Sequence, residues 1–217
     1  MSSRALRGLG LGVLTLAVAS SMSVPASAGV RQSGVAEDKA AAGSGATCYS
    51  NAKDVGTFGV MSQNFAPVLD AYDSAAADDL TLRKTCKVRS IQVTGSYSAE
   101  GAVDSETVTF YKDEVGRPGK IISSQTRVGT DNGAGSYDIK LKPVTLKKGT
   151  YWVSVVANLN PDAGGQWYWT SSNTQKGAAA LWENPRGGWQ YGCLTWTKIY
   201  QCLGAGPGPD LAFSLLP

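Results

Sequence analysis

The sequence predicts an all-β fold: an antiparallel two-sheet β-sandwich, jelly-roll-like in connection, with two disulfides. Three observations support this class. From residue 86 to the end, short runs of alternating apolar and polar residues follow one another, separated by turns rich in Gly, Pro and Asn. The same region has no amphipathic segment of helix length, and four cysteines allow two bridges. The chain shows no internal repeat, which disfavours a propeller or a β-helix.

The N-terminal segment has the pattern of a secretory signal peptide, predicted over residues 1–28. Arg4 and Arg7 give a basic start, residues 9–19 are apolar, and a small-x-small motif ends at Ala28. The apolar core is too short to span a bilayer, and no later run approaches the roughly 20 apolar residues that spanning needs. We therefore expect a secreted, extracellular protein without membrane insertion.

The region after the signal peptide is expected to become ordered only near the first cysteine. Residues 29–47 are small, polar and aperiodic, which predicts a disordered leader or linker, and residues 48–217 are predicted to form a single β-sandwich domain. Within that domain, residues 54–60 and 65–69 read as weak extended segments. Residues 71–80 are Ala-rich and predicted as a loop or a short turn.

The strands predicted after residue 86 are defined by their alternation. Residues 151–158 have apolar side chains on both faces, so this strand should lie at the centre of a sheet and be covered on both sides. The other predicted strands are 91–97, 105–112, 120–128, 137–142, 166–171, 178–182 and 211–216.

The four cysteines are assigned to two disulfides because the chain is predicted to be exported. Cys193 and Cys202 lie in one Gly- and aromatic-rich loop, which favours their joining each other and leaves Cys48 with Cys86. A zinc site is the rival interpretation. The spacing and the lack of any histidine argue against it.

Charge and composition exclude several classes of function. Without Arg4 and Arg7 the 20 basic residues fall to 18, against 17 acidic residues, so the formal charge of the remaining chain is +1. Such a balance gives no support for capture of nucleic acid or an anionic membrane. The absence of histidine excludes Ser-His-Asp and Cys-His nucleophiles and the common histidine-containing metal sites.

Carboxylates are the remaining candidates for catalysis or metal binding. Glu183 follows Trp182 at a predicted strand end and is the weak catalytic candidate of a glycosidase or lyase, which would need a second carboxylate. Asp78 and Asp79 are weak calcium candidates, although their spacing matches no defined calcium loop and solvated turns are the alternative. No cofactor is expected apart from a possible structural calcium.

The aromatic segment is the best candidate for recognition, because residues 150–202 contain all six tryptophans. Trp167 and Trp169 share one face of a strand and are expected to enter the core. In the loop that follows, flat rings among glycines could stack on a sugar or on an apolar partner. The alternative is that they plug one end of the sandwich. The predicted ligand-binding residues of this loop are Trp182, Trp189, Tyr191 and Trp196.

A string of short motifs also carries a resemblance to a known family. The motifs are ADDL at 77–80, IQVTGSY at 91–97, VTFYKDEVGRPG at 108–119, GTYWVSVVANL at 149–159, GQWYW at 165–169, WENPRGGWQYGCLTW at 182–196 and PDLAFSLL at 209–216. Together they resemble bacterial, actinobacterial-type exported β-sandwich domains, found alone or as accessory modules of secreted hydrolases. Cys86 departs from the aromatic or apolar residue expected there. The resemblance implies the fold and an extracellular location, and it supplies no catalytic site.

These observations lead to one expected function and two alternatives. We expect a secreted, non-catalytic binding or accessory module whose partner is a polysaccharide or cell-wall glycan. The first alternative is an extracellular protein-interaction or matrix component that uses the same loop as an apolar anchor. The second is a carboxylate-dependent glycoside hydrolase or lyase acting through Glu183.

Overall fold

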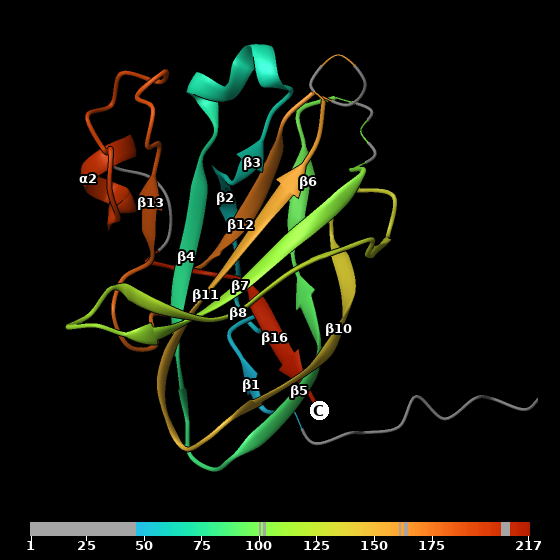
Figure 1. Ribbon diagram of the computed structural model, residues 1–217, viewed down its shortest axis with the longest axis vertical. Coiled ribbons are helices and arrows are strands. Elements are labelled where there is room, and N and C mark those ends of the chain that lie inside the picture. The colour runs from blue at the N-terminus through green and yellow to red at the C-terminus, as the bar shows by residue number, and fades with distance from the viewer. Residues whose placement is uncertain (1–46, 100, 102, 161, 163–164, 205–208) are drawn as a thin grey trace, which may run out of the picture. The chain divides into compact units, whose positions relative to one another are not determined.

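The computed structural model describes residues 47–217 except 100, 102, 161, 163–164 and 205–208. The predicted signal peptide and nearly all of the predicted leader therefore lie outside the described residues. The described part is built from antiparallel strands in two packed layers (Figure 1). The predicted all-β antiparallel sandwich with two disulfides is confirmed.

The first layer is a seven-stranded sheet with β11 at its centre. Its path is β14 (Thr197–Lys198), β13 (Leu181–Glu183), β4 (Ala75–Leu82), β11 (Gly149–Asn158), β7 (Ser105–Asp113) and β8 (Pro118–Arg127), with β3 (Gln63–Asn64) parallel to β11. Trp152 and Val153 are neighbours on β11 and point to opposite faces, yet both are fully buried. The prediction of a central strand covered on both sides is thus confirmed.

The second layer consists of two smaller sheets. One has the order β1 (Tyr49–Ser50), β16 (Phe213–Leu216), β5 (Cys86–Val93), β10 (Tyr137–Leu146) and β9 (Thr130–Asp131). In the other, β12 (Trp167–Ser172) pairs with β15 (Asp210–Leu211), β2 (Val55–Met61) and β6 (Gly95–Tyr97).

The two smaller sheets join at a fork, where one edge of β12 pairs first with β6 and then with β15 while β2 pairs with the other edge. Three main-chain hydrogen bonds connect Thr94, Thr170 and Ala212 at 2.9 to 3.1 Å. Gly95 makes the junction possible because a Cβ atom at this position would lie only 2.6 Å from the Trp167 Nε1 atom. The two sheets therefore form one bent layer.

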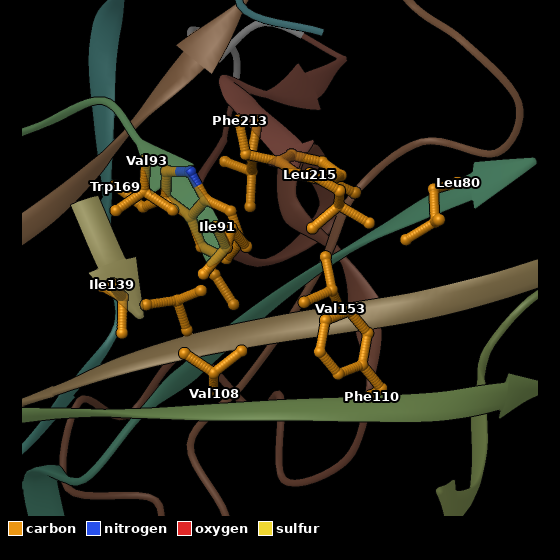
Figure 2. Close-up of a cluster of buried hydrophobic side chains, with 14 of the residues drawn as sticks. Leu80, Ile91, Val93, Val108, Phe110, Ile139, Val153, Trp169, Phe213 and Leu215 are labelled. Atoms are coloured by element: carbon orange, nitrogen blue, oxygen red, sulfur yellow. The ribbon is translucent and has the colours of Figure 1, made fainter. Parts of the chain in front are cut away.

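The core lies between the layers, as Figure 2 shows. Leu80, Val108, Phe110 and Val153 come from the seven-stranded sheet and face Ile91, Val93, Ile139, Trp169, Phe213 and Leu215 from the bent layer. All of these side chains are at most 3% exposed. Trp167 and Trp169 are fully buried as well, which confirms that this pair enters the core.

Two predicted segments near the start of the domain are wrong. Residues 65–69 were expected to be extended, but a 3₁₀ helix, η1 (Pro67–Tyr72), occupies most of this range because Pro67 suits the first helical turn. Residues 71–80 were expected to form a loop, but Ala75–Leu82 is strand β4, paired on both sides with β11 and β13. Tertiary pairing here overrides the low strand propensity of Ala and Asp.

Both predicted disulfides are confirmed. Cys48–Cys86 joins the start of the described chain to β5, and Cys193–Cys202 closes a loop with a sequence separation of 9. Cys202 lies on the five-residue helix α2 (Ile199–Leu203). Across the part of the chain that the structure describes, no helix has the length and apolar character needed to cross a membrane.

Candidate functional site

The segment from Trp182 to Cys202, here called the aromatic loop, is fixed to the sandwich by a buried amide. The Asn184 Nδ2 atom donates to the carbonyl oxygens of Ala71 and Asp73, each at 2.8 Å. Its Oδ1 atom accepts the N–H of Trp189 at 3.1 Å, and its own N–H donates to the Cys193 carbonyl. Because Asn184 is 2% exposed, these bonds are shielded from water and hold the loop against η1.

Five of the six tryptophans are held in place by their indole N–H groups. The acceptors are Asp113 Oδ1 for Trp152, Gly135 O for Trp167, Ala212 O for Trp169, Met61 O for Trp182 and Tyr72 O for Trp189. A buried indole N–H needs such a partner, so these bonds are part of the packing.

Trp182 is the predicted ligand-binding residue that the structure contradicts. It lies on β13, is 1% exposed and packs in the main core. Its ring cannot stack on a ligand. The sequence placed it at the start of a loop, whereas pairing of β13 with β4 turns the ring inward.

Trp189 is half-buried and attaches the loop to its surroundings. Its ring meets Tyr72 edge-on at a centroid distance of 5.1 Å and lies 6.3 Å from Phe65. These contacts and the bond to the Tyr72 carbonyl turn the ring onto the segment that contains η1. Its main structural contribution is to position the aromatic loop.

Trp196 has a different environment from the other tryptophans. It is partly exposed, and among the described residues no acceptor binds its indole N–H. Its ring packs edge-on against Tyr111 at 6.2 Å and lines an open hollow of about 350 Å³. The hollow, here called the Trp196 hollow, is also lined by Gly116, Arg117, Leu181, Thr195, Thr197, Lys198 and Gln201. An aromatic ring is thus placed beside several hydrogen-bonding side chains.

In the aromatic loop, Tyr191 and Leu194 are the most exposed large apolar side chains, at 53% each, followed by Tyr200 at 51%. The Tyr191 ring lies 6.0 Å from the buried ring of Trp182, so its inner edge is supported while its outer part meets water. Tyr191, one of the predicted ligand-binding residues, is therefore accessible from the solvent.

Glu183 ends β13, as predicted, and is partly buried near the Trp196 hollow. Burial raises its pKa from 4.5 to about 7, and a hydrogen bond from the backbone N–H of Trp196 lowers it in part. The Glu183 charge in turn helps burial to raise the pKa of Tyr111. The protonation of Glu183 is therefore poised near neutral pH. A glycosidase would need a second carboxylate about 5 to 9.5 Å away, and none contributes to this pKa shift.

Asp78 and Asp79, the calcium candidates, lie in β4 and not in a solvated turn. Asp78 is fully buried, and its two oxygens accept the N–H groups of Asp79 and Leu211. Burial, reinforced by the nearby Asp210 charge, raises the pKa of Asp78 well above its usual range. Among the residues that the structure describes, no group of three or more Asp, Glu, His or Cys side chains is arranged to hold a metal ion. Asp78 instead connects β4 to β15.

Sequence reasoning missed Asn184 and the polar lining of the Trp196 hollow. Arg117 belongs to the turn between β7 and β8, whereas Thr195 and Lys198 come from the aromatic loop. The two segments are distant in sequence and become neighbours only in the folded protein. A signal for Asn184 was present in the sequence, since Asn-Pro after a strand is a turn-initiating pair.

Comparison with known proteins gives no relative from which a role could be transferred: no family model, no curated protein and no solved structure matches the chain.

Proposed function

We propose that the protein is a secreted, non-catalytic binding module that holds a glycan in the Trp196 hollow. The observation that carries this proposal is that Trp196, alone among the six tryptophans, has no indole N–H acceptor among the described residues and lines an open hollow. An indole ring offers a flat apolar face to the C–H side of a sugar ring. Its N–H can donate to a hydroxyl or ring oxygen.

The chemistry around Trp196 suits a polyhydroxylated ligand. Thr195, Thr197 and Gln201 both donate and accept hydrogen bonds, and Arg117 and Lys198 add further donors. The backbone beneath them is fixed by the Cys193–Cys202 bridge and by Asn184. Binding to such a pre-organised loop loses little conformational entropy.

The two disulfides support the extracellular part of the proposal. Such bridges form and persist in oxidising compartments, where polysaccharides and cell-wall glycans are found. This location agrees with the signal peptide that the sequence predicts over residues 1–28.

The test is affinity electrophoresis of the full chain through a panel of neutral soluble glycans, with pull-down on insoluble ones. Trp196→Ala is expected to weaken retention about ten- to thirty-fold, the effect of losing a central aromatic anchor. Trp196→Phe keeps a ring but removes the N–H, so it should lose less. The matched control is Phe58→Ala, which removes an aromatic ring that is 51% exposed on β2.

Absence of retention on every glycan, or equal retention of wild type and Trp196→Ala, would overturn the glycan assignment. The alternative of an extracellular protein partner would then rest on Tyr191 and Leu194, the two most exposed apolar side chains of the aromatic loop. A Tyr191→Ser/Leu194→Ser variant that loses a protein partner, in the absence of any glycan binding, would select it.

A further inference from the structure

A second site is suggested by positive charge at the end of the sandwich where two connections cross between the layers. The β4–β5 connection contains Arg83 and Lys84, and the β10–β11 connection contains Lys147 and Lys148. Leu146 pairs with Cys86 and Gly149 pairs with Leu82. This register brings the two connections next to each other, and they lie side by side at the lower end of Figure 1.

Local contacts hold the two connections in place. The Thr81 and Thr150 hydroxyl oxygens lie 3.1 Å apart, which links β4 to β11 just before and just after the charged residues. The Tyr151 hydroxyl donates to the Lys147 carbonyl at 3.1 Å. The charged side chains therefore project from a fixed backbone.

A hollow of about 770 Å³ opens beside the β4–β5 connection. Its lining is Cys48, Tyr49, Ser50, Thr81, Arg83, Lys84, Lys176 and Gly177. Lys176 adds a third cation from another part of the chain, and its Nζ atom lies 5.8 Å from the centre of the Tyr49 ring. Ser50 and Thr81 add hydroxyl groups, and the lining includes no acidic residue.

We name Arg83, Lys84, Lys147, Lys148 and Lys176 the cationic end. All five side chains are exposed. None forms a salt bridge with a described residue, because the two salt bridges found there, Lys140–Asp138 and Arg186–Asp70, involve other groups. The Lys176 Nζ atom donates to the Ser50 carbonyl, and its charge partly offsets the burial that raises the pKa of Asp210.

Three carboxylates lie near Tyr49 of the hollow, Asp78, Asp79 and Asp210, and each is at most 3% exposed. Gly177 covers Asp79, since a Cβ atom on this glycine would lie 2.2 Å from the Asp79 Oδ2 atom. Asp210 accepts hydrogen bonds from the Asn51 amide and the Lys176 backbone N–H. These acids therefore present no carboxylate to a ligand in the hollow.

We propose that the cationic end binds an acidic polysaccharide, a chain that bears carboxylate or sulfate groups at intervals. Cations spread over two connections and a hollow match repeated anionic groups better than one small anion. Hydroxyl side chains beside them suit sugar hydroxyls. This inference is independent of the Trp196 hollow, which uses other residues.

Nucleic acid is the competing polyanion, and the structure favours it less. Single-stranded nucleic acid sites combine cations with aromatic rings on which bases stack. The exposed Phe and Tyr side chains of the described residues lie outside this hollow, and Tyr49, which lines it, is half-buried under Lys176. The two disulfides also indicate an oxidising compartment.

The experiment is affinity electrophoresis of the full chain through heparin, polygalacturonate, neutral dextran and a poly(dT) oligonucleotide. Retention should appear on heparin or polygalacturonate, fall steeply between about 50 and about 200 mM salt, and be absent on dextran. Heparin reports sulfate and polygalacturonate reports carboxylate, so the two gels identify the anionic group.

Two double variants and a matched control locate the site. Arg83→Gln/Lys84→Gln and Lys147→Gln/Lys148→Gln should each weaken retention roughly ten- to thirty-fold, as expected for two lost cations near an anionic surface. The control Lys140→Gln/Lys142→Gln removes two exposed lysines from β10 and should change retention less than about twofold. Because the changed side chains are exposed, the melting temperature verifies that each variant is folded.

Three outcomes would overturn the proposal: no retention of the wild type on either acidic polysaccharide, equal loss in the control variant, or retention on poly(dT) as strong as on the polysaccharides. Trp196→Ala should behave as wild type in these gels. Failure of the Trp196 proposal is therefore distinguishable from failure of this one.

Discussion

Trp182 and Trp196 lie close in sequence, yet the structure gives them opposite environments. Trp182 is buried, with its indole N–H bound to the Met61 carbonyl, whereas Trp196 lines a hollow and has no such acceptor among the described residues. Residue type is the same in both cases. The difference shows that the aromatic content of a segment does not identify a binding surface. The partner of the indole N–H is a better guide.

The largest effect that tests this comparison is on stability. Trp182→Ala should lower the free energy of unfolding by about 3 to 5 kcal/mol, because it leaves a large cavity in the core. Trp196→Ala should change it by less than about 1 kcal/mol. Urea unfolding measures both. Equal losses would show that Trp196 is a core residue and that the comparison is wrong.

Removing the disulfide of the aromatic loop should have the next largest effect. Cys193→Ser/Cys202→Ser opens a short loop, for which the chain-entropy model gives a loss of about 2.5 to 3 kcal/mol. Retention on glycans should fall as well, because Trp196 lies between the two cysteines. The contrasting variant is Cys48→Ser/Cys86→Ser, which opens a longer loop, with a sequence separation of 38, and should cost about 4 kcal/mol. Under conditions in which this variant is folded, its Trp196-dependent retention on glycans should equal that of wild type.

A substitution of Trp189 should have a smaller effect on stability, because its ring is hydrogen-bonded but only half-buried. Trp189→Phe removes the hydrogen bond to the Tyr72 carbonyl and should cost about 1 kcal/mol of unfolding free energy. Retention on glycans should weaken less than with Trp196→Ala. If Trp189→Phe abolishes retention and leaves stability unchanged, Trp189 contacts the ligand directly.

The smallest effect concerns Glu183 and depends on pH. The folded state raises its pKa to about 7, so its contribution to stability is present below about pH 4.5 and is lost as the pH rises through about 7. Glu183→Gln mimics the protonated form. After allowance for solvent screening, it should be more stable than wild type by about 1 kcal/mol at about pH 8 and equal to it at about pH 4.

The free energy of unfolding in urea is measured for wild type and for Glu183→Gln at both pH values. The result is how much the stability difference between the two proteins changes from one pH to the other. Other carboxyl groups, including Asp79 and Glu106, also have raised pKa values and affect both proteins alike. An unchanged difference between variant and wild type across this range would show that Glu183 is solvated. The Trp196 hollow would then lack a buried acid at its side.

The strands with regular alternation could be predicted from sequence, because one buried face fixes the period. Strand β10 is an example. Strand β11 was predictable for a different reason: its two apolar faces placed it at the centre of a sheet. Strand β4 could not be predicted. Its buried Asp78 is tolerated because the N–H of Leu211, 133 residues later, donates to the carboxylate.

The candidate site was only partly predictable for the same physical reason. The disulfide pairs followed from cysteine spacing and count. The burial of Trp182 and the exposure of Trp196 depend instead on backbone carbonyls and strand pairings contributed by distant segments. The cationic end depends on such pairings too, because its two connections are 63 residues apart, counted from Lys84 to Lys147, and meet only through strand register.

The position of β16 has a consequence for how the chain acquires its structure. This last strand lies between β1 and β5, so both neighbours lack their partner until the C-terminal residues are available. During vectorial synthesis the bent layer cannot close before Phe213–Leu216 has emerged from the ribosome. Until then one edge of β5 stays without its strand partner.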